Sequence, residues 1–514
     1  MVHPITLALA AVFLLLEGSA VHAAAVSPYA KDGDPVAGSY PFRRLMLDAM
    51  AVEESSGLER VFHKLEKHPG NPVLRRDRPW EGWGPYLYGT VLWDAGRLRM
   101  WYQIIGDGSR VCYAESADGI NWVKPELGLV DYNGSKANNI VVEGLCSIPS
   151  VMRVPQPASP DKKWVMYGYG PKGPHHAYSP DGLRWTWQTP PEGERLFSSS
   201  DVVNFFWDPY QDRYVAMLKM GARRHRSVGL ATSKDGVHWT RLMDHPVFTA
   251  DDLDPDPTQV YGMPVFPYQG AYIGLPWIYH ARFFKYGKYT VPRMHEAQED
   301  SDRTIDVQLT WSWNLVNWTR TPAREPFLEL GPDGSWDDGM VFTAITPVAV
   351  GDKLYFYYGG FDQAHDDYEG IKGEIGLATL RLDGFCSLRA GETEGFFISR
   401  RELFRIPRVS INARTHGDGY IVAEIVDRHN RVIPGFSRED CIPFRGDSVS
   451  HLMRWRTEAF PEEMLKPDKK LRFFLKNAEL FSYLPEGIDE SDYPHRPQEG
   501  KPESFPTEVA RKLQ

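Results

Sequence analysis

RMWYQIIGDGSRVCYAESADGINW, residues 99–122, holds two apolar, strand-like runs and ends in a tight turn, SADGINW. The same order of an apolar run and an S-x-D-G-x-x-W turn returns along the chain, twice in full and twice in weaker form. The five copies are RMWYQII with SADGINW, KWVMYGY with SPDGLRW, YVAMLKM with SKDGVHW, YIGLPWI with SWNLVNW, and LYFYYGG with Asp383, Gly384 and Leu388. Recurrence of one unit at this scale indicates a repeat architecture.

The spacing of the copies indicates which repeat it is. Measured at the turn glycine or its equivalent, the copies lie at 119, 182, 236, 315 and 384, and the gaps are 63, 54, 79 and 69 residues. Each gap suits one four-stranded sheet with loops of varying length. We therefore predict an all-β chain with a five-bladed β-propeller at 80–395, because radial closure removes the exposed edges of its sheets.

The acid of each turn has a structural explanation. Asp hydrogen-bonds the backbone that follows it, Gly adopts a positive φ, and the terminal Trp packs back onto the sheet. We therefore expect Asp118 and its equivalents to form turns at the outer edge of the sheets. Acids that take part in chemistry are expected elsewhere, at the axis.

The first residues differ from the repeat. LALAAVFLLL at 7–16 is an apolar run followed by small residues and by VHA at 21–23. This pattern predicts a secretory signal peptide at 1–23, although the residues before the run include no Lys or Arg. The run is too short to span a bilayer, and no other segment is longer and equally apolar. We expect a secreted or periplasmic protein with no membrane span.

Three further segments flank or follow the repeat. Residues 24–79 form a lead-in of mixed character, in which 53–67 suggests one short helix. Short period-two runs between Gly-rich turns at 396–484 predict a β-sandwich packed against the propeller. Residues 485–514 are rich in Pro and charge and poor in apolar residues, which predicts an irregular tail.

Composition excludes several classes of function. The chain has 58 Lys and Arg against 68 Asp and Glu, a formal net charge of -10, which disfavours nucleic-acid binding. The four cysteines, Cys112, Cys146, Cys386 and Cys441, stand in no CxxC or Cys/His spacing, so the sequence predicts no zinc or redox motif. They allow two disulfides in three pairings, or free buried thiols.

Acids at the starts of the inner strands are the candidates for chemistry, because these starts converge on one mouth of a propeller axis. The runs that open the five inner strands carry Glu81, Asp201, Asp256, Asp337 and Asp338. Glycosidic cleavage needs a protonated acid and an ionised carboxylate in one pocket. The candidate catalytic residues are therefore Glu81, Asp201, Asp337 and Asp338. Each has an alternative role, since such acids also cap loops or pair with Arg.

Other side chains near these starts offer contacts to a sugar. The basic run 223–226 suits a carboxylate, sulfate or phosphate on a substrate, or else forms a solvated loop. His365 suits the rim or an axial cation, or a structural role. The long segment 280–303 suits a lid or a surface insertion. The candidate substrate-binding residues are Trp83, Tyr88, Arg223, Asp256, Tyr261, Trp277, Trp336 and His365.

The repeat, its strand-entry acids and the β-rich C-terminal part resemble the five-bladed propeller glycoside hydrolases, above all family 32 and its relatives in families 43 and 117. The likeness to exported bacterial proteins described as family 32 N-terminal-like is carried by YGMPVFPYQGAYIGLPWIYH at 261–280, GSWDDGM at 334–340 and LATLRLDGFCSL at 377–388. The resemblance implies acids on the first three blades, and Glu81 and Asp201 stand near the first and third of these places. The family 32 motifs W-M-N-D-P-N-G, R-D-P and E-C are absent.

The sequence predicts a secreted glycoside hydrolase that cleaves a poly- or oligosaccharide through carboxylates in the central pocket. Two alternatives stay open: a carbohydrate-binding propeller without catalysis, and a sialidase-like enzyme, whose Asp-box resembles these turns. We expect no required cofactor and no catalytic metal, with a structural cation such as Ca²⁺ on the axis as the one metal that the architecture accommodates. The expected partner is a carbohydrate, not a nucleic acid.

Overall fold

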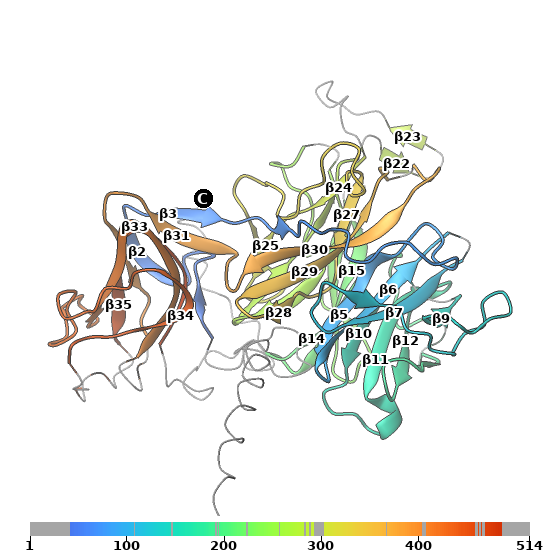
Figure 1. Cartoon of the computed structure of the whole chain (residues 1–514), viewed down its shortest axis with the longest axis horizontal. Coiled ribbons are helices and arrows are strands. Elements are labelled where there is room, and N and C mark those ends of the chain that lie inside the picture. The colour runs from blue at the N-terminus through green and yellow to red at the C-terminus, as the bar shows by residue number, and fades with distance from the viewer. Residues whose placement is uncertain are drawn as a thin grey trace, which may run out of the picture.

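The computed structural model shows a β-rich chain of two lobes (Figure 1). The described part includes one short 3₁₀ turn, η2 (Pro160–Lys162). The structure describes residues 42–485 apart from 107, 145–146, 191–192, 194, 223–224, 256–257, 282–283, 287–288, 292–302, 366, 403, 405–407, 458–460, 462–463 and 465–467.

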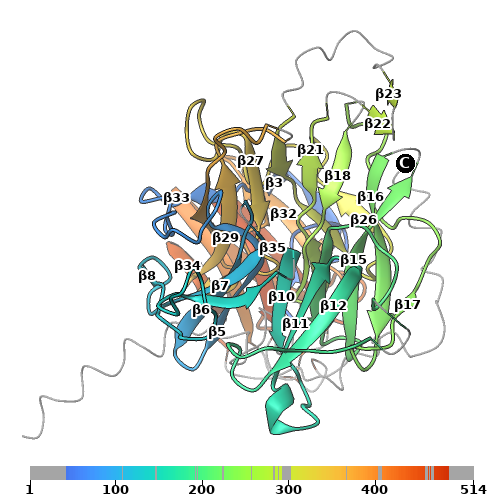
Figure 2. The ribbon, with the colours of Figure 1, turned by 90° about the vertical axis from the view of Figure 1, so that its right-hand side faces the viewer.

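The larger lobe begins with three antiparallel meanders of four strands, each running from an inner strand to a short outer strand (Figure 2). The first is extended by β9 (Ile140–Glu143), which pairs with β7. The first meander consists of β5 (Tyr86–Asp94), β6 (Arg97–Ile104), β7 (Arg110–Ser116) and β8 (Trp122–Val123). The second consists of β10 (Ser147–Arg153), β11 (Trp164–Gly170), β12 (Gly173–Ser179) and β13 (Thr186–Trp187). The third consists of β14 (Val203–Asp208), β15 (Arg213–Ala222), β16 (His225–Ser233) and β17 (Thr240–Arg241).

Two further sheets complete this lobe, and a hairpin of β22 (Phe284–Tyr286) and β23 (Tyr289–Val291) extends from it. One is a four-stranded sheet of β19 (Val265–Tyr268), β20 (Ala271–Gly274), β25 (Thr310–Ser312) and β26 (Trp318–Arg320). The other is an eight-stranded sheet of β18 (Gln259–Gly262), β21 (Trp277–Tyr279), β24 (Ile305–Val307), β27 (Met340–Thr343), β28 (Val348–Val350), β29 (Lys353–Phe361), β30 (Gly373–Arg381) and β4 (Glu66–Lys67).

The inner strands of these sheets stand next to one another in a propeller-like arrangement. β5 contacts β10 and β29, β10 contacts β14, and β14 contacts β19. The arrangement includes the first sheet, which β9 extends to five strands, and three sheets of four strands that follow it in sequence order. The inner strands therefore lie side by side. The acids and aromatic residues that the sequence predicts at one mouth of the axis stand near the starts of these strands.

The repeat turns have the expected structural role. One carboxylate oxygen of Asp118 accepts hydrogen bonds from two backbone N–H groups of its turn, at 2.9 and 2.8 Å. Gly119 has a φ of +80°, and the indole of Trp122 donates to its carbonyl at 3.2 Å. The same carboxylate or amide contacts recur at Asp181, Asp235 and Asn314. The prediction that these acids are structural is confirmed.

The fifth copy of the turn, predicted at 383–384, does not form in this way. Asp383 is completely buried, and its carboxylate lies 2.9 Å from the guanidinium of Arg43. The hydroxyl of Tyr268 donates to Asp383 at 2.6 Å, and that of Ser482 donates at 2.7 Å. Asp383 thus joins the two lobes, because Tyr268 belongs to the larger lobe while Arg43 and Ser482 flank or form strands of the smaller one.

The smaller lobe is one eight-stranded sheet centred on its C-terminal strand, β35 (Lys470–Pro485). This strand pairs with β33 (Val409–Val426) along most of its length and with β1 (Arg44–Leu45), β31 (Cys386–Ala390) and β32 (Gly395–Ser399) on the other side. Its strands are β1 (Arg44–Leu45), β2 (Val52–Ser56), β3 (Glu59–Phe62), β31 (Cys386–Ala390), β32 (Gly395–Ser399), β33 (Val409–Val426), β34 (Asp447–Met453) and β35 (Lys470–Pro485).

The helix predicted at 53–67 is wrong. The residues form β2, β3 and β4, which pair with β32, β31 and β30 respectively. A strand at the edge of a sheet has unpaired backbone N–H and C=O groups. The lead-in residues pair with these groups by forming further strands along the edges. The local sequence carries a helical pattern, but the strands that pair with these residues lie more than 300 residues away along the chain.

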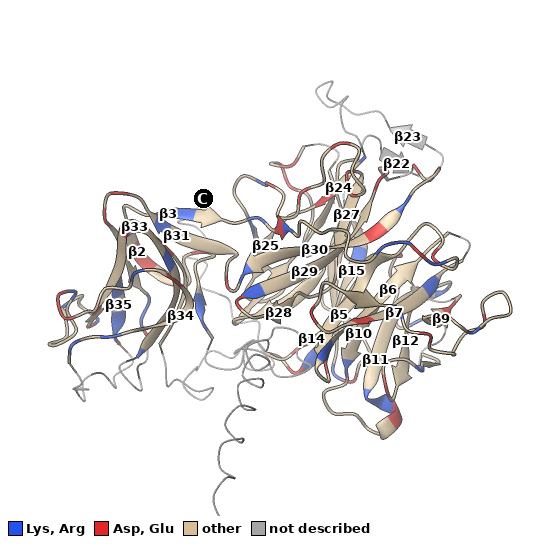
Figure 3. Cartoon of the chain, viewed as in Figure 1, with Lys and Arg blue, Asp and Glu red and all other residues tan. Residues whose placement is uncertain are grey.

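Cys112, Cys386 and Cys441 are buried free thiols, which agrees with the second of the two predicted alternatives. Burial raises the pKa of the Cys386 thiol to about 12 and that of Cys441 to about 11. Cys146 lies outside the described residues, as do the predicted signal peptide and the tail from 486 onward. In the part that the structure describes, no helix has the length and apolar character needed to cross a bilayer. Figure 3 shows Lys and Arg interspersed with Asp and Glu over both lobes.

Candidate functional site

Glu81 is completely buried where the first meander begins. Its carboxylate accepts hydrogen bonds from the hydroxyl of Tyr102 at 3.0 Å and from the ammonium of Lys124 at 2.5 Å. The backbone N–H groups of Asp77 and Arg78 donate to its other oxygen at 2.9 and 3.0 Å. Four donors occupy the acceptor positions of one carboxylate. Glu81 therefore has the contacts of a structural residue, and its catalytic role stays a prediction from the sequence.

Asp337 belongs to a second buried group, which lies against β4. Its side chain accepts hydrogen bonds from the ammonium of Lys67 at 2.5 Å and from the hydroxyl of Tyr358 at 2.9 Å, and the residue is only 3% exposed. The ring of Trp336 stacks on Tyr358 with centroids 5.6 Å apart. Asp338 accepts a backbone hydrogen bond within its own loop at 2.5 Å. No described contact joins these three predicted residues to the group described next.

Asp201 precedes β14, and its carboxylate is accessible. Its side chain is 58% exposed, and Oδ1 accepts a 2.7 Å hydrogen bond from the ammonium of Lys219 on β15, whose side chain is 7% exposed. The hydroxyl of Ser200 donates to the same oxygen at 3.2 Å. Among the described residues none donates to Oδ2 of Asp201. One oxygen is therefore held in place while the other is open to a ligand.

Burial and charge set the protonation of this pair. Burial raises the pKa of the Asp201 carboxyl, but the charge and hydrogen bond of Lys219 with the bond from Ser200 lower it by more, so the net pKa lies below its usual value. Burial lowers the pKa of the Lys219 ammonium to about 8, against the opposing charge of Asp201. At neutral pH the carboxylate is ionised and the ammonium keeps its proton.

Two cations stand beside Tyr261, which lies on β18. Nζ of Lys219 is 4.3 Å from the ring centroid, and the guanidinium carbon of Arg226, on β16, is 5.4 Å from it. The guanidinium of Arg226 is also 5.3 Å from the ring of Tyr279 on β21. Aromatic faces attract cations electrostatically. Lys219 and Arg226 both belong to the third meander, and these contacts place them against the sheet that contains β18 and β21.

Several of the predicted binding residues lie together in an aromatic cluster around Phe342. The ring of Tyr88 stacks on Trp277 with centroids 5.0 Å apart and meets Phe342 edge-on at 4.7 Å. Tyr261 contacts Phe342 at 5.7 Å and His365 at 5.3 Å. Tyr88, Tyr261, Trp277 and His365 therefore converge, although they come from three distant parts of the sequence. Their role as binding residues stays a prediction.

Trp83 extends the cluster toward solvent. Its ring is nearly parallel to that of Tyr368, with centroids 5.3 Å apart and an interplanar angle of 9°. Tyr368 is 46% exposed and lies 6.4 Å from His365. A flat and partly exposed pair of rings offers an apolar face on which a sugar ring can pack.

Two of the predicted binding residues, Arg223 and Asp256, lie outside the described residues. The predicted lid at 280–303 is described only in part, as the hairpin of β22 and β23 and the residues at its two ends. In the rest of the described chain no three His, Cys, Asp or Glu side chains group closely enough to hold a metal ion. The axial cation therefore stays a prediction.

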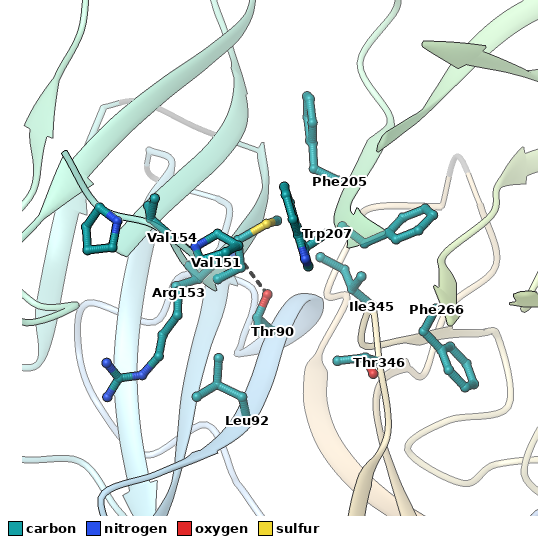
Figure 4. A pocket seen from close by; sticks show the side chains of 14 residues that line it. Thr90, Leu92, Val151, Arg153, Val154, Phe205, Trp207, Phe266, Ile345 and Thr346 are labelled. Atoms are coloured by element: carbon teal, nitrogen blue, oxygen red, sulfur yellow. Dashed lines mark hydrogen bonds between the residues drawn. The ribbon is translucent and has the colours of Figure 1, made fainter. Parts of the chain in front are cut away.

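A cavity of about 390 Å³ lies at the opposite ends of the inner strands (Figure 4). Its lining comes from the second halves of β5, β10 and β14 and from residues that follow β27, and it is mainly apolar. The one charged side chain in the lining is Arg153, which is hydrogen-bonded to Asp94. Because no carboxylate lines this cavity, it lacks the groups that glycosidic cleavage needs.

Sequence reasoning missed Lys219 as the partner of Asp201. Lys219 stands in YVAMLKM, a run that is otherwise apolar. A Lys in a buried strand needs a compensating acid or ring, and this was the available signal. Arg226 was part of the basic run 223–226, but nothing in that run distinguishes the side chain that reaches Tyr261 from its neighbours.

No family model matches this sequence, and no curated protein matches it. Solved structures resemble it in part. A glycosyl hydrolase from Bacteroides ovatus is 16% identical with a TM-score of 0.40, covering 62% of this chain and 94% of its own. A structure described under the GH130 family of mannoside phosphorylases, as containing glycoside hydrolases that target β-1,2 mannosidic linkages in Candida mannan, is 18% identical with a TM-score of 0.42, covering 62% and 94%.

An N-acetylgalactosamine deacetylase from F. plautii is similar to the same degree. It is 16% identical with a TM-score of 0.36, and the match covers 69% of this chain and 96% of the deacetylase. The similar structures thus include glycoside hydrolases and an enzyme with a different reaction. Likenesses at these identities and TM-scores carry no argument about the reaction of this chain, which has to be derived from its own residues.

Proposed function

We propose that this chain is a secreted glycoside hydrolase that cleaves a poly- or oligosaccharide beside Asp201. The observation that carries the proposal is the open Oδ2 of an ionised, 58% exposed carboxylate. Lys219 fixes this carboxylate next to the aromatic cluster around Phe342. Glycosidic cleavage uses an ionised carboxylate as nucleophile or as base, and rings that pack on sugar faces orient the substrate. Asp201 has the protonation state of that nucleophile or base.

The proposal includes a five-bladed propeller. The fifth blade consists of β27, β28, β29, β30 and β4, while β18, β21 and β24 complete the fourth blade at its axial end. Two observations support this division: β29 contacts β5 of the first meander, and Tyr357 on β29 hydrogen-bonds the turn at Gly119. The smaller lobe is proposed as a β-sandwich, formed by the long strands β33 and β35 as they bend.

A carbohydrate-binding protein without catalysis is the second candidate. The specific observation in its favour is that hydrogen-bond donors of the chain itself engage both Glu81 and Asp337. These contacts leave Asp201 as the accessible acid among the three, whereas hydrolysis needs a proton donor as well. The aromatic cluster serves either function.

The test is hydrolysis of a panel of aryl glycosides and polysaccharides by the purified chain and by Asp201→Asn. If Asp201 is the nucleophile or base, the variant loses about 100-fold or more of the turnover while its affinity for the sugar persists. Asp244→Asn is the matched control. It makes the same chemical change at an exposed acid in the loop that follows the same meander, and should turn over as the wild type does.

Two outcomes would change the conclusion. Wild-type turnover in Asp201→Asn, on a substrate that the protein does cleave, removes the assignment of Asp201. If the chain binds a glycan but cleaves no substrate in the panel, the result supports the second candidate, a carbohydrate-binding protein without catalysis.

A further inference from the structure

We infer that the sugar bound at this site is negatively charged, carrying a uronic acid carboxylate or a sulfate ester. The inference rests on the proposed function in one respect only, namely that the ligand is a carbohydrate. It is drawn from Arg226 and Lys219, the two cations beside Tyr261.

Arg226 lies against two rings and, among the described residues, has no anion within hydrogen-bond distance, although the charge of Asp201 acts on it from farther away. Its side chain is half-buried against Tyr261 and Tyr279, and in the described part of the chain it makes no hydrogen bond or ion pair. A guanidinium carries five N–H donors in a planar fork that matches a carboxylate or a sulfate. A half-buried guanidinium with unused donors is therefore a preformed site for an oxyanion.

Other buried or half-buried arginines of the same lobe show what a structural guanidinium looks like. Three of them have a carboxylate partner within hydrogen-bond distance. The pairs are Arg99 with Asp94 at 2.9 Å, Arg213 with Asp208 at 3.1 Å, and Arg320 with Asp254 at 2.5 Å. Arg226 departs from this pattern at the place where the aromatic cluster and Asp201 meet.

Lys219 adds a second cation that is only partly used. Its ammonium has three donors, and one is bonded to Asp201. No other acceptor for it is found among the described residues. Lys219 and Arg226 together carry two positive charges against the single negative charge of Asp201. One further negative charge, supplied by the ligand, neutralises the group.

The neighbouring aromatic rings favour a sugar as the carrier of that charge. A small free anion would engage the cations alone, whereas a sugar with an acidic substituent engages the rings of Trp83, Tyr368 and Tyr261 and the cations at once. Uronates and sulfated sugars both carry an oxyanion. Binding measurements distinguish the two classes of sugar.

The experiment is calorimetric titration of the full chain with three matched oligosaccharides: an oligogalacturonate, a neutral oligogalactose of equal length, and a sulfated oligogalactose. We expect one or both acidic sugars to bind at least about tenfold more tightly than the neutral one. Arg226→Gln should remove about 10- to 100-fold of the affinity for the acidic sugar and change the affinity for the neutral sugar little. Arg226→Lys should keep part of the affinity that Arg226→Gln loses, because lysine has the positive charge but not the planar set of N–H donors.

Arg241→Gln is the control for long-range attraction. It removes the same charge from the outer strand β17 of the same meander, and it should leave the preference for acidic sugars intact. Thermal unfolding of Arg226→Gln and Arg226→Lys verifies that both variants are folded. If the preference for acidic sugars depends on hydrogen bonds from the guanidinium of Arg226, it is therefore lost in Arg226→Gln and kept in Arg241→Gln.

The outcomes separate this inference from the proposed hydrolase. If a neutral sugar binds as tightly as both acidic ones, or if Arg226→Gln keeps the preference, the inference is overturned even where neutral glycans are cleaved. If an acidic sugar binds through Arg226 and is not cleaved, the inference stands and the hydrolase proposal fails. A preference for the sulfated sugar over the uronate identifies the ester, and the reverse identifies the carboxylate.

Discussion

The hydroxyl of Tyr357 donates a 2.7 Å hydrogen bond to the carbonyl of Gly119, 238 positions away along the chain. The contact fastens β29 to the turn of the first meander. Two more turns are held in the same way by a ring of the preceding sheet. They are the turn at Gly182, bound by Trp101 at 2.7 Å, and the turn at Gly236, bound by Tyr167 at 3.0 Å. These three repeat turns are thus docking points between neighbouring sheets, and Tyr357 joins the sheet of β29 to the first meander.

Tyr357→Phe should lower the free energy of unfolding by about 1 to 3 kcal/mol, because the carbonyl of Gly119 stays buried without its donor. Urea unfolding followed by tryptophan fluorescence measures the change. Tyr355→Phe is the control, since Tyr355 lies two residues away on the same strand and its hydroxyl makes no hydrogen bond among the described residues. Equal losses in the two variants would show that the bond to Gly119 contributes nothing.

Gly119→Ala should destabilise the protein more than Gly96→Ala. Both glycines have a φ of +80°, so both variants carry the backbone strain of about 1 to 2 kcal/mol. A Cβ at Gly119 would lie 2.5 Å from the hydroxyl of Tyr357 and 2.9 Å from Leu98, whereas a Cβ at Gly96 meets nothing within 4 Å. The overlap adds about 1 to 3 kcal/mol. The two midpoints of thermal unfolding give the comparison, and identical midpoints would contradict the docked turn.

Asp383→Asn should cost about 3 to 5 kcal/mol, because it leaves the guanidinium of Arg43 buried without a counter-charge. The control is Glu329→Gln, which breaks the exposed pair of Lys64 and Glu329 and should cost at most about 1 kcal/mol. Both losses are read from urea unfolding at pH 7. A loss below about 1 kcal/mol in Asp383→Asn would mean that the join between the lobes does not depend on the pair.

His176 should make the protein sensitive to acid. Burial lowers its pKa to about 4, while an unfolded His has a pKa near 6.5. Between these values the unfolded chain binds the extra proton, so stability is lost as the pH falls from 6.5 toward 4, by about 2 kcal/mol at pH 4.5. His176→Phe should reduce the stability difference between pH 7 and 4.5 by that amount, and His416→Phe, at an exposed His, should not. Parallel pH profiles for all three proteins would exclude His176 as the cause.

Turnover should fall as the pH rises through about 8. Burial lowers the pKa of Lys219 to about 8, so above that pH the amine loses its proton and Asp201 loses its counter-charge. The Asp201 carboxylate itself stays ionised over this range, because its pKa lies below the usual value. Lys219→Arg keeps the positive charge and should move the upper limb of the pH profile to higher pH. A limb that does not move in this variant is set by another group.

Much of the candidate site was accessible from the sequence. Asp201, Tyr88 and Tyr261 stand in the runs that open inner strands, and Trp277 and His365 were predicted to bind the same sugar. The structure brings the rings into one cluster, with Asp201 beside Tyr261 through Lys219. Period-two strands and turn residues act within a few positions, so they fix where a strand begins and which way it enters the axis.

The sequence could not rank the candidate acids. Glu81 and Asp201 look alike as strand-entry residues. Four donors surround Glu81, one of them Lys124 from 43 positions away, whereas Asp201 keeps one carboxylate oxygen open. Asp337 is engaged by Lys67, 270 positions away. A carboxylate is structural or reactive according to the donors that surround it, and those donors arrive only with the tertiary fold.

The sequence by itself determined the β class, the repeat turns and the positions of the inner strands, because these depend on hydrogen bonds and steric preferences within a few residues. The tertiary structure decided that 53–67 would extend sheet edges, that Asp383 would pair with Arg43, and that Lys219 and Arg226 would stand beside Tyr261. Burial, ion pairing and pKa depend on which distant segments meet, and a linear pattern does not contain that information.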